Sequence, residues 1–330
     1  MLQLRARTMQ NVRDYFIRNN YLELDTPALS PDLIPETCLE VFRTDYIEPW
    51  EKGIKPLYLV PSPEIYIKKI IAQHKINVFQ LSKCYRNVES IGRIHNPEFT
   101  MLEYYTMQAN YIDSIDITES FFENLISSVS TESTASFSSV RPPFLRLTMD
   151  DAFERYAGFR LSYCREATDL ALHALQLGLA EPKHAPFSTW PWDDLYELIF
   201  VQCVEQKLPK DRAVVLMDYP IQADCLAKDK QPTPPNSRIE WKERWELYCG
   251  GMEIANCYTE ENDPEKIRTY FEKEGKSKLR TARVVHKTDP DYWKLFREFP
   301  ECSGVALGFD RLLALLSGHT TIAPVLPFPL

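Results

Sequence analysis

Residues 85–107 read YRNVESIGRIHNPEFTMLEYYTM, a polar, glycine-containing loop followed by an extended run that begins at Phe99. Arg86 and His95 lie in the loop. Because side chains alternate along a strand, one face of the run carries an aromatic ring, a carboxylate, a phenol and two thioethers, from Phe99, Met101, Glu103, Tyr105 and Met107. Such a face is unusual for a plain core. It suits a ligand that is anionic at one end, flat in the middle and cationic at the other.

The composition is that of an ordinary globular protein. The chain has 330 residues, enough for one large domain or two, and 44% of them are hydrophobic and 26% charged. A formal net charge of −9 argues against non-specific nucleic-acid binding, which depends on Lys and Arg neutralising phosphates. No apolar run comes near the roughly twenty residues of a membrane span, and the N-terminus lacks the apolar core of a signal peptide. We therefore expect no membrane association.

The eight cysteines are scattered along the chain without a CxxC pair. This spacing does not fit a zinc site, and a disulfide framework is not expected in so long a chain. Buried free thiols in a reducing compartment are the expectation, which predicts a cytoplasmic protein.

Local patterns predict the elements before the opening stretch. A helix over residues 3–19 follows from the spacing of its apolar side chains, and strands are predicted over 21–24 and 78–85. Ser62-Pro63-Glu64 is typical of a helix start, with a cap residue, a proline and an acid in the first turn. Glu64 is then either an acid that the helix dipole favours or a carboxylate that faces a ligand.

The middle of the chain is less informative. The Ser/Thr-rich residues 126–140 predict a surface connector. Residues 148–207 predict a helical insertion between the halves of one catalytic domain, and residues 213–217 a short buried strand.

Residues 245–260, WELYCGGMEIANCYTE, predict a β-hairpin that turns at two glycines. In the predicted register Tyr248 faces Glu253 and Glu246 faces Ala255, which makes the two glutamates diagonal neighbours roughly 7–8 Å apart. Two carboxylates this close repel unless a cation lies between them, and their oxygen atoms suit Mg²⁺. The hairpin therefore predicts a metal site, with a solvated acidic face as the alternative. The same stretch adds two polar residues, Asn256 and Glu260.

Residues 302–318, CSGVALGFDRLLALLSG, predict a glycine-punctuated strand that turns into an apolar helix. Arg311 falls in the first turn of that helix, where its charge adds to the positive end of the helix dipole. This position favours a phosphate group, and an ion pair with a neighbouring acid is the alternative.

Together these stretches resemble class II aminoacyl-tRNA synthetases. The first helix with YLELDTP is similar to motif 1, YRNVESIGRIHNPEFTMLEYY to motif 2, and GVALGFDRL to motif 3. SPE, HNPEFTMLEYY and GGMEIAN resemble the lysyl branch in particular. The resemblance covers nearly the whole chain. It implies an α+β fold, with an antiparallel sheet flanked by helices, in a single catalytic domain over residues 1–330.

Motif 1 begins near residue 3, and no N-terminal anticodon-binding OB domain is expected before it. That arrangement, and Ala255 in EIAN where synthetases have Gly, resemble the synthetase paralogues that modify elongation factor P. That family uses ATP to activate lysine, preferably (R)-β-lysine, and transfers it to a lysine side chain of elongation factor P. The resemblance also implies a homodimer through motif 1, and no recognition of a tRNA anticodon.

The resemblance assigns roles to the residues that match. Arg86 and Arg311 are the expected catalytic arginines, Phe99 the ring that stacks on adenine, and Glu246 with Glu253 the pair that holds Mg²⁺. The other residues expected at ATP are Asn87, Glu89, His95 and Asn96, besides Glu246. Those expected at the amino-acid substrate are Ser62, Glu64, Glu103, Tyr105, Glu253, Ala255, Asn256 and Glu260.

Two departures from the family pattern bear on the substrate. Val88 separates the Arg-Asn pair from Glu89, in a loop one residue longer than expected, and Glu89 is expected to reach the adenine amino group. Cys257 stands where the family usually has Gly, in the wall of the amino-acid pocket, and is expected to narrow it.

Two other functions remain open at this point. One is a stand-alone lysine-activating enzyme whose acceptor is a tRNA or a small amine. The other is a catalytically inactive, synthetase-like regulatory protein. The presence of Arg86, Glu246, Glu253 and Arg311 argues against the inactive form, which need not keep both metal acids and both phosphate arginines.

Overall fold

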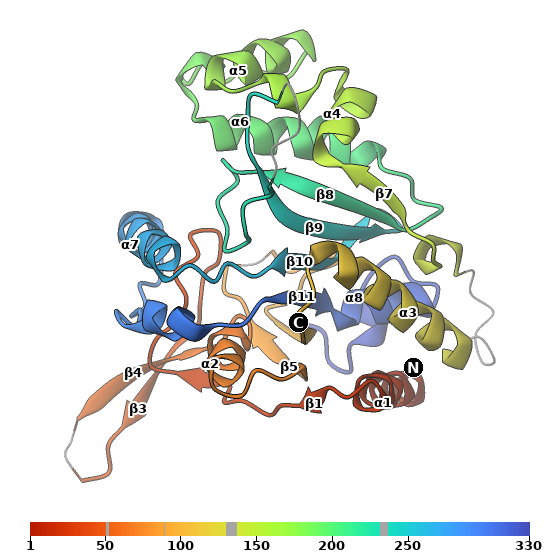
Figure 1. Cartoon of the computed structure of the whole chain (residues 1–330), viewed down its shortest axis with the longest axis vertical. Helices are drawn as coiled ribbons and strands as arrows, with labels where there is room; N and C mark the ends of the chain where they lie inside the picture. Colours follow the sequence, from red (N-terminus) through yellow and green to blue (C-terminus); the bar gives the residue numbers. More distant parts are fainter. Residues whose placement is uncertain (51–52, 89, 130–136, 232–236) are drawn as a thin grey trace.

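The computed structural model describes residues 1–50, 53–88, 90–129, 137–231 and 237–330. Its centre is an eight-stranded sheet in the order β1-β5-β6-β11-β10-β9-β8-β7 (Figure 1). Strands pair antiparallel except at the two edges, where β1 is parallel to β5 and β7 to β8. The strands are β1 Leu22–Glu23, β5 Val78–Tyr85, β6 Glu98–Met107, β7 Leu145–Thr148, β8 Val214–Pro220, β9 Trp241–Cys249, β10 Met252–Thr259 and β11 Cys302–Gly308. The α+β prediction is confirmed.

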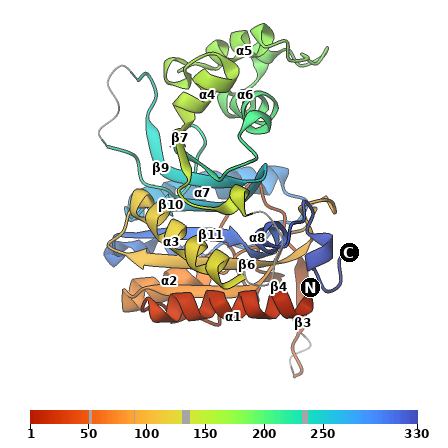
Figure 2. The same cartoon turned by 90° about the vertical axis from the view of Figure 1, so that its right-hand side faces the viewer.

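Three helices cover one face of this sheet, α1 (Leu2–Arg18), α3 (Tyr111–Val129) and α8 (Phe309–Leu316). Figure 2 shows α1 and α3 side by side along the sheet. The core between them is apolar and strongly aromatic, because Phe16 lies at the centre of a ring cluster with Phe79, Tyr104 and Phe121. These helices close one face of the sheet, so a site must lie on the other.

On that other face, a second group of elements packs at the β5–β6 end of the sheet. It consists of α2 (Glu64–His74), α7 (Pro264–Thr281) and the 3₁₀ helix η6 (Tyr292–Glu298), whose apolar residues share a core with Val78 and Tyr105. A separate three-stranded sheet, β2 (Leu29–Ser30), β4 (Ile54–Leu59) and β3 (Arg43–Ile47), lies nearby, and its β3–β4 hairpin projects from the body of the molecule (Figure 1).

The predicted helical region follows β7 and ends before β8. It contains α4 (Met149–Ala157), α5 (Ala167–Gln176) and α6 (Trp192–Ile199), then a π-helical turn, η4 (Phe200–Val204). These elements have an apolar core of their own, which they share with β8 and β9. They form a crossover that joins two parallel strands.

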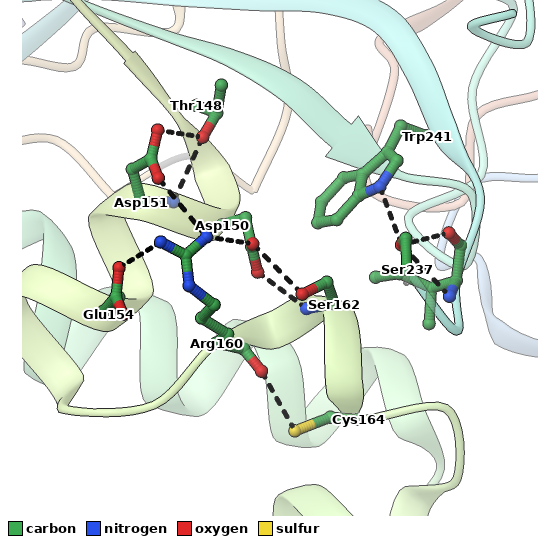
Figure 3. Close-up of polar contacts among 10 residues, drawn as sticks. Thr148, Asp150, Asp151, Glu154, Arg160, Ser162, Cys164, Ser237 and Trp241 are labelled. Atoms are coloured by element: carbon green, nitrogen blue, oxygen red, sulfur yellow. Dashed lines mark hydrogen bonds and ion pairs between the residues drawn. The ribbon is translucent and has the colours of Figure 1, made fainter. Parts of the chain in front are cut away.

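Arg160 ties the start of this helical region together (Figure 3). Its guanidinium lies 3.0 Å from Asp150 and 2.5 Å from Glu154, both on α4. Asp150 in turn accepts hydrogen bonds from the backbone N and the hydroxyl of Ser162. The loop after α4 is therefore fixed to the helix by charge-assisted hydrogen bonds.

Two sequence predictions need correction here. The segment 126–140 is not simply a surface connector, because Ile126 and Val129 lie on α3 and are buried, as are Phe137 and Val140. The serines and threonines hid the helical spacing of these apolar residues. Residues 130–136 of the segment lie outside the described residues. All eight cysteines are free thiols, as predicted, but Cys38 is exposed.

The helix prediction for residues 3–19 agrees with α1 to within one residue at each end, and the strand prediction for 78–85 matches β5. In the part of the chain that the structure describes, no helix is both long and apolar enough to cross a membrane.

Candidate functional site

A cleft of about 940 Å³ opens on the face of the sheet that α1, α3 and α8 leave uncovered. Cleft-lining residues come from β6, β9, β10 and β11, from the start of α2 and α8, and from α6, η4 and α7. Among the predicted site residues, the cleft brings together Ser62, Glu64, Arg86, His95, Asn96, Phe99, Glu103, Tyr105, Glu246, Glu253, Asn256, Glu260 and Arg311. Residues nearly 250 positions apart thus meet in one space, as the gap between Ser62 and Arg311 shows.

One end of the cleft holds two arginines and an aromatic ring. The guanidinium carbon of Arg86 lies 5.2 Å from the centroid of the Phe99 ring, within cation–π distance. Its Nε is buried and has no hydrogen-bond partner among the described residues. A buried donor without a partner is costly, and an anionic ligand would satisfy it.

Arg311 is fixed by the backbone around it. Its Nε donates to the Ile94 carbonyl at 3.1 Å and its Nη1 to the Glu253 carbonyl at 2.9 Å. The Glu253 carboxylate lies 3.7 Å from the same Nη1. Arg311 is the third residue of α8, near the positive end of the helix dipole, so this end of the cleft attracts anions from two directions.

The loop between β5 and β6 supplies His95 and Asn96, but Asn87 is not part of the cleft lining. Asn87 instead holds the chain to residues 40–41, through its backbone N to the Glu40 carbonyl and its side-chain amide to the Val41 carbonyl. The inserted Val88 has a positive φ of 59°, a conformation that disfavours a β-branched side chain. Glu89 lies outside the described residues.

The other end of the cleft is acidic. Glu103 is 2% exposed and accepts hydrogen bonds from the Ser62 hydroxyl at 2.5 Å and the Tyr105 hydroxyl at 3.3 Å. Burial raises the pKa of Glu103 to about 8, with the charge of Glu64 as the next cause. Burial also raises the pKa of Glu260 to about 7, because the opposing charge of Lys68 offsets only part of the desolvation. Buried carboxylates in this state are poised to receive a cationic group.

Ser62 helps to shape this acidic end, although not quite as predicted. The helix α2 begins at Glu64 with Pro63 as its N-cap, one residue later than the sequence suggested. The Ser62 hydroxyl accepts a hydrogen bond from the Glu64 backbone N at 3.0 Å and donates to Glu103. The helix start and the strand β6 are thus joined through one hydroxyl.

The floor between the two ends is strand β11, which presents only small residues to the cleft, Gly304, Ala306 and Gly308. In the sheet, Gly304 lies beside Tyr105 on β6, and Ala306 lies between Glu103 on β6 and Asn256 on β10. The Tyr105 ring and the Glu260 carboxylate lie against Gly304 on this strand. The depth of the cleft depends on the absence of side chains there.

The predicted β9–β10 hairpin forms, but its register shifts at a β-bulge. Tyr248 faces Glu253 as predicted, and both turn glycines have positive φ. A bulge between Glu253 and Ala255 then places Glu246 opposite Asn256 and not opposite Ala255. The extra residue turns Asn256 toward the cleft and Ala255 into the apolar core.

Ala255 and Cys257, which were expected in the amino-acid pocket, therefore lie in the apolar core and not in the cleft lining. Cys257 is 1% exposed, belongs to the same core, and lies 2.9 Å from the Ser114 hydroxyl of α3. The expected face of Ala255 assumed an unbroken period of two along β10, and Cys257 was placed in the pocket wall by the family resemblance. A bulge reverses the inside and outside positions of every residue that follows it.

Glu246 and Glu253 remain on the same wall of the cleft. Glu246 accepts hydrogen bonds from Arg244 at 2.5 Å and from the Tyr248 hydroxyl at 2.7 Å. Desolvation raises the pKa of Glu253 to about 7, and the negative charge of Glu246 is the next cause, although 42% of the Glu253 side chain remains open to water. The described residues contain no group of three or more His, Cys, Asp or Glu that could hold a metal. The pair fits Mg²⁺ only if phosphate oxygens complete the coordination.

Sequence reasoning missed several residues that shape this cleft. Lys68 lies behind the acidic end, and its position one helical turn after Glu64 was a usable signal. Arg244 holds both Glu246 and Asn256 and stacks over the Tyr219 ring at 4.3 Å. No local pattern marked the cleft-lining residues of α6 and α7, because their contribution depends on tertiary packing.

Comparison with known proteins agrees with this picture. The sequence profile of the family described as tRNA synthetases class II (D, K and N) matches residues 1–330. The "Elongation factor P--(R)-beta-lysine ligase" of Vibrio atlanticus (strain LGP32) is 30% identical over 333 residues, covering 99% of this chain and 95% of that protein. Its counterpart in Vibrio cholerae is 30% identical, with 99% and 94% covered.

A second kind of relative is the "Lysine--tRNA ligase" of Psychrobacter sp. (strain PRwf-1), also 30% identical over 332 residues. The match covers 99% of this chain but 62% of that longer protein. The predicted resemblance to the lysyl branch and to the elongation factor P ligases is confirmed, as is the ligase class of enzyme. The chain belongs to the class II tRNA synthetase family of the D, K and N type.

Proposed function

We propose that the protein activates lysine with ATP, preferably as (R)-β-lysine, and transfers it to a lysine side chain of elongation factor P. One observation carries the proposal. A single cleft has Arg86, Phe99 and Arg311 at one end and Glu64, Glu103 and Glu260 at the other. Lysine-type amino acids have a carboxylate that must meet ATP and a distant ammonium group that must be neutralised, and the cleft offers a complement to each.

In the first step, a carboxylate oxygen of the amino acid attacks the α-phosphorus of ATP. The bond from that phosphorus to the β-phosphate bridge breaks, and pyrophosphate leaves with the electron pair. In this proposal, Arg86 and Arg311 hold the phosphates in line and balance the negative charge that builds up. Mg²⁺ held by Glu246, Glu253 and the phosphates would add further positive charge there.

In the second step, the amine of the acceptor attacks the carbonyl carbon of the adenylate. The bond to AMP breaks, AMP leaves with the electron pair, and the attacking nitrogen loses a proton. The amine must arrive neutral, which a desolvated cleft containing two arginines favours. The step needs no nucleophilic serine or cysteine, and this matches the inert, buried thiol of Cys257.

The names of the relatives support elongation factor P as the acceptor, since the Vibrio proteins match this chain over nearly their whole length. The match to lysine–tRNA ligases keeps a tRNA acceptor as an outcome of the test. The predicted homodimer through motif 1 remains part of the proposal. Its support is the exposed apolar surface of Leu2, Ile17 and Leu22, which are 68%, 53% and 52% exposed. Light scattering in solution tests the dimer.

Two assays test the function in sequence. Lysine-dependent exchange of pyrophosphate into ATP reports activation alone. If no lysine isomer supports exchange, the protein is neither an elongation factor P ligase nor a lysine-activating enzyme with another acceptor. The mass of elongation factor P after incubation with ATP and (R)-β-lysine or α-lysine then reports transfer. Good exchange with an unchanged mass, together with charging of a tRNA, would favour the other acceptor.

Glu253→Gln tests the metal assignment within the same assay. Exchange should fall by about a hundredfold or more, because a charged oxygen ligand beside the phosphates is lost. Glu272→Gln on the exposed side of α7 is the matched control and should leave exchange unchanged. Near-normal exchange in Glu253→Gln would refute the metal role.

A further inference from the structure

Lys68 is a fully buried cation directly behind the acidic end of the cleft, and it is 0% exposed. Its Nζ lies 2.5 Å from Glu64 Oε1 and 2.7 Å from Glu260 Oε2. Glu64 and Glu260 line the cleft, whereas Lys68 joins them from the protein side. Burial alone would lower the pKa of Lys68, but the two carboxylates outweigh this effect and hold the pKa well above its usual value. The lysine therefore stays charged.

A buried charge of this kind is costly unless it is paired on more than one side. The charged or titratable groups that act on Lys68 come from six segments: Glu36, Glu64, Glu103, Glu260, Tyr292 and Cys302. The described neighbours thus include more acids than one lysine can neutralise. The surplus of negative charge faces the cleft.

We propose that Lys68 is a positioning residue that sets the charge of the amino-acid pocket to match a substrate with two ammonium groups. The inference rests on the proposed function. Glu36 has two other cations near it, Arg86 and Lys278, and is left out of the count. With Glu64, Glu103 and Glu260 ionised, three negative charges and the one positive charge of Lys68 leave a net charge of −2. Lysine and β-lysine each bring two ammonium groups, and their carboxylate goes to the arginines at the other end.

Lys68 also fixes where those charges lie. It clamps Glu64 on α2 to Glu260, the residue that follows β10, two acids that would otherwise repel and share a proton. Because the substrate meets the acids and not Lys68, the lysine acts through them. Loss of Lys68 should therefore change the affinity for lysine and the pH dependence of that affinity, and should leave ATP binding unchanged.

The test is lysine-dependent pyrophosphate exchange between pH 6.5 and 8.5. Lys68→Met should raise the KM for lysine about tenfold or more at pH 7. The midpoint of the pH dependence of this KM should also move to higher pH, because one of the acids then holds a proton more tightly. The KM for ATP should stay within about twofold of its normal value. Lys68→Arg keeps the charge and should remain within about threefold of the natural protein in lysine KM.

A double variant separates charge balance from mere loss of structure. Lys68→Met with Glu260→Gln removes one charge of each sign and keeps the net charge of −2. It should restore the pH dependence of the natural protein, even where its KM remains raised. A lysine KM and pH profile in Lys68→Met within twofold of normal would overturn the inference. So would a double variant with the same pH profile as Lys68→Met, or equal losses in Lys68→Arg and Lys68→Met.

Failure of the proposed function is recognised separately, because it is the natural protein that would then show no exchange. If Lys68→Met does not fold, Lys68→Arg and the double variant still decide the matter.

Discussion

At the scale of single residues, the acidic end of the cleft depends as much on a missing side chain as on those present. Gly304 has no Cβ, and the Glu260 carboxylate and the Tyr105 ring occupy the space that one would need. Its backbone conformation is ordinary for any residue, since its φ is not positive. The glycine is therefore required by packing and not by backbone geometry.

Gly304→Ala should abolish most lysine-dependent activity. The new methyl would overlap Glu260 and come within 2.8 Å of Tyr105 Cδ1, so both cleft-lining side chains must move. We expect kcat/KM for lysine in exchange to fall by about a hundredfold, while ATP binding measured by calorimetry stays normal. Gly275→Ala is the control, because a Cβ there meets no atom within 4 Å. Equal activity of the two variants would contradict the packing argument.

The acidity of the pocket predicts how lysine binding responds to pH. Glu260 and Glu103 have pKa values raised to about 7 and about 8 in the empty protein, while the side-chain amino group of lysine, with a pKa of about 10.4, stays protonated over this range. Binding requires the ionised acids, so the apparent affinity for lysine should rise as pH increases from 6.5 to 8.5. Calorimetry in buffers of different ionisation enthalpy should detect proton release on binding near pH 7.

The same raised pKa values make the stability of the protein without lysine fall as pH increases. A carboxyl group whose pKa is raised on folding stabilises the fold below its unfolded value of about 4.5, and that contribution is lost as pH rises through the folded value. Glu103→Gln should therefore remove part of the decline in stability with pH. Urea unfolding at several pH values without lysine measures this, and an unchanged decline would contradict the raised pKa of Glu103.

At the scale of elements, one buried ion pair ties three segments together beneath the cleft. Arg5 on α1 lies 2.6 Å from Asp310 on α8, and its other nitrogen donates to the Thr100 hydroxyl on β6 at 2.7 Å. Asp310 also accepts a hydrogen bond from the Thr100 backbone N at 2.6 Å. The network fixes the start of α8, and with it Arg311, relative to the strand that carries Phe99 and Glu103.

Arg5→Met should cost about 3–5 kcal/mol of stability, because it leaves the Asp310 carboxylate buried without its partner. Arg13→Met is the matched control on the same helix. Arg13 pairs with Glu23 where both side chains are 33% exposed, so its loss should cost less than about 1 kcal/mol. Urea unfolding of both variants makes the comparison, and similar costs would show that the Asp310 network adds no special stability.

A substitution in the loop between β5 and β6 should stabilise the protein. Val88 is 51% exposed and has a φ of 59°, where Asn is tolerated far better than a β-branched residue. Val88→Asn should therefore raise the free energy of unfolding by about 1 kcal/mol. Val285→Asn, at another exposed valine, is the control and should not stabilise. A destabilised Val88→Asn variant would show that its side chain makes contacts worth more than the strain.

At the scale of the whole molecule, the cleft is assembled from nearly every part of the fold. Its lining runs from Glu36 to Ile322 and includes the helical region between β7 and β8. A ligand that fills the cleft therefore contacts segments that belong to separate apolar cores. A non-hydrolysable lysyl-adenylate analogue at a hundred times its Kd should add about 2.7 kcal/mol to stability.

Hydrogen exchange measured by mass spectrometry tests whether this stabilisation is shared. Protection should increase together in α6, α7 and the β9–β10 hairpin, since each contributes to the same cleft. Protection confined to residues 85–107 would show that the analogue does not engage the helical region.

The sequence was most informative where the chemistry is local. The alternation of β6 from Phe99 to Tyr105, the Gly-Gly turn and the strand-to-helix step before Arg311 are each encoded within a few residues, and the structure has them as predicted. Met107, predicted on the same face of β6, lies outside the cleft lining. Other features depend on distant parts of the chain. Nothing near Asn87 marks its hydrogen bonds to residues 40–41, and the alternation of β10 conceals the bulge before Ala255. The roles of the individual site residues stay predictions until the assays are done.

The bulge in β10 also limits the ways in which this pocket can change over time. The strand carries one residue more than its partner, and that surplus decides which side chains face the substrate. Regular pairing at the same chain length would turn Ala255 and Cys257 toward the cleft and Asn256 into the core, without any exchange of amino-acid type at these positions. Loss of Ile254 would instead remove the surplus residue and keep Ala255 opposite Leu247 and Asn256 opposite Glu246. Along this wall, a change in strand register would redraw substrate preference in one evolutionary event, where substitutions would need several.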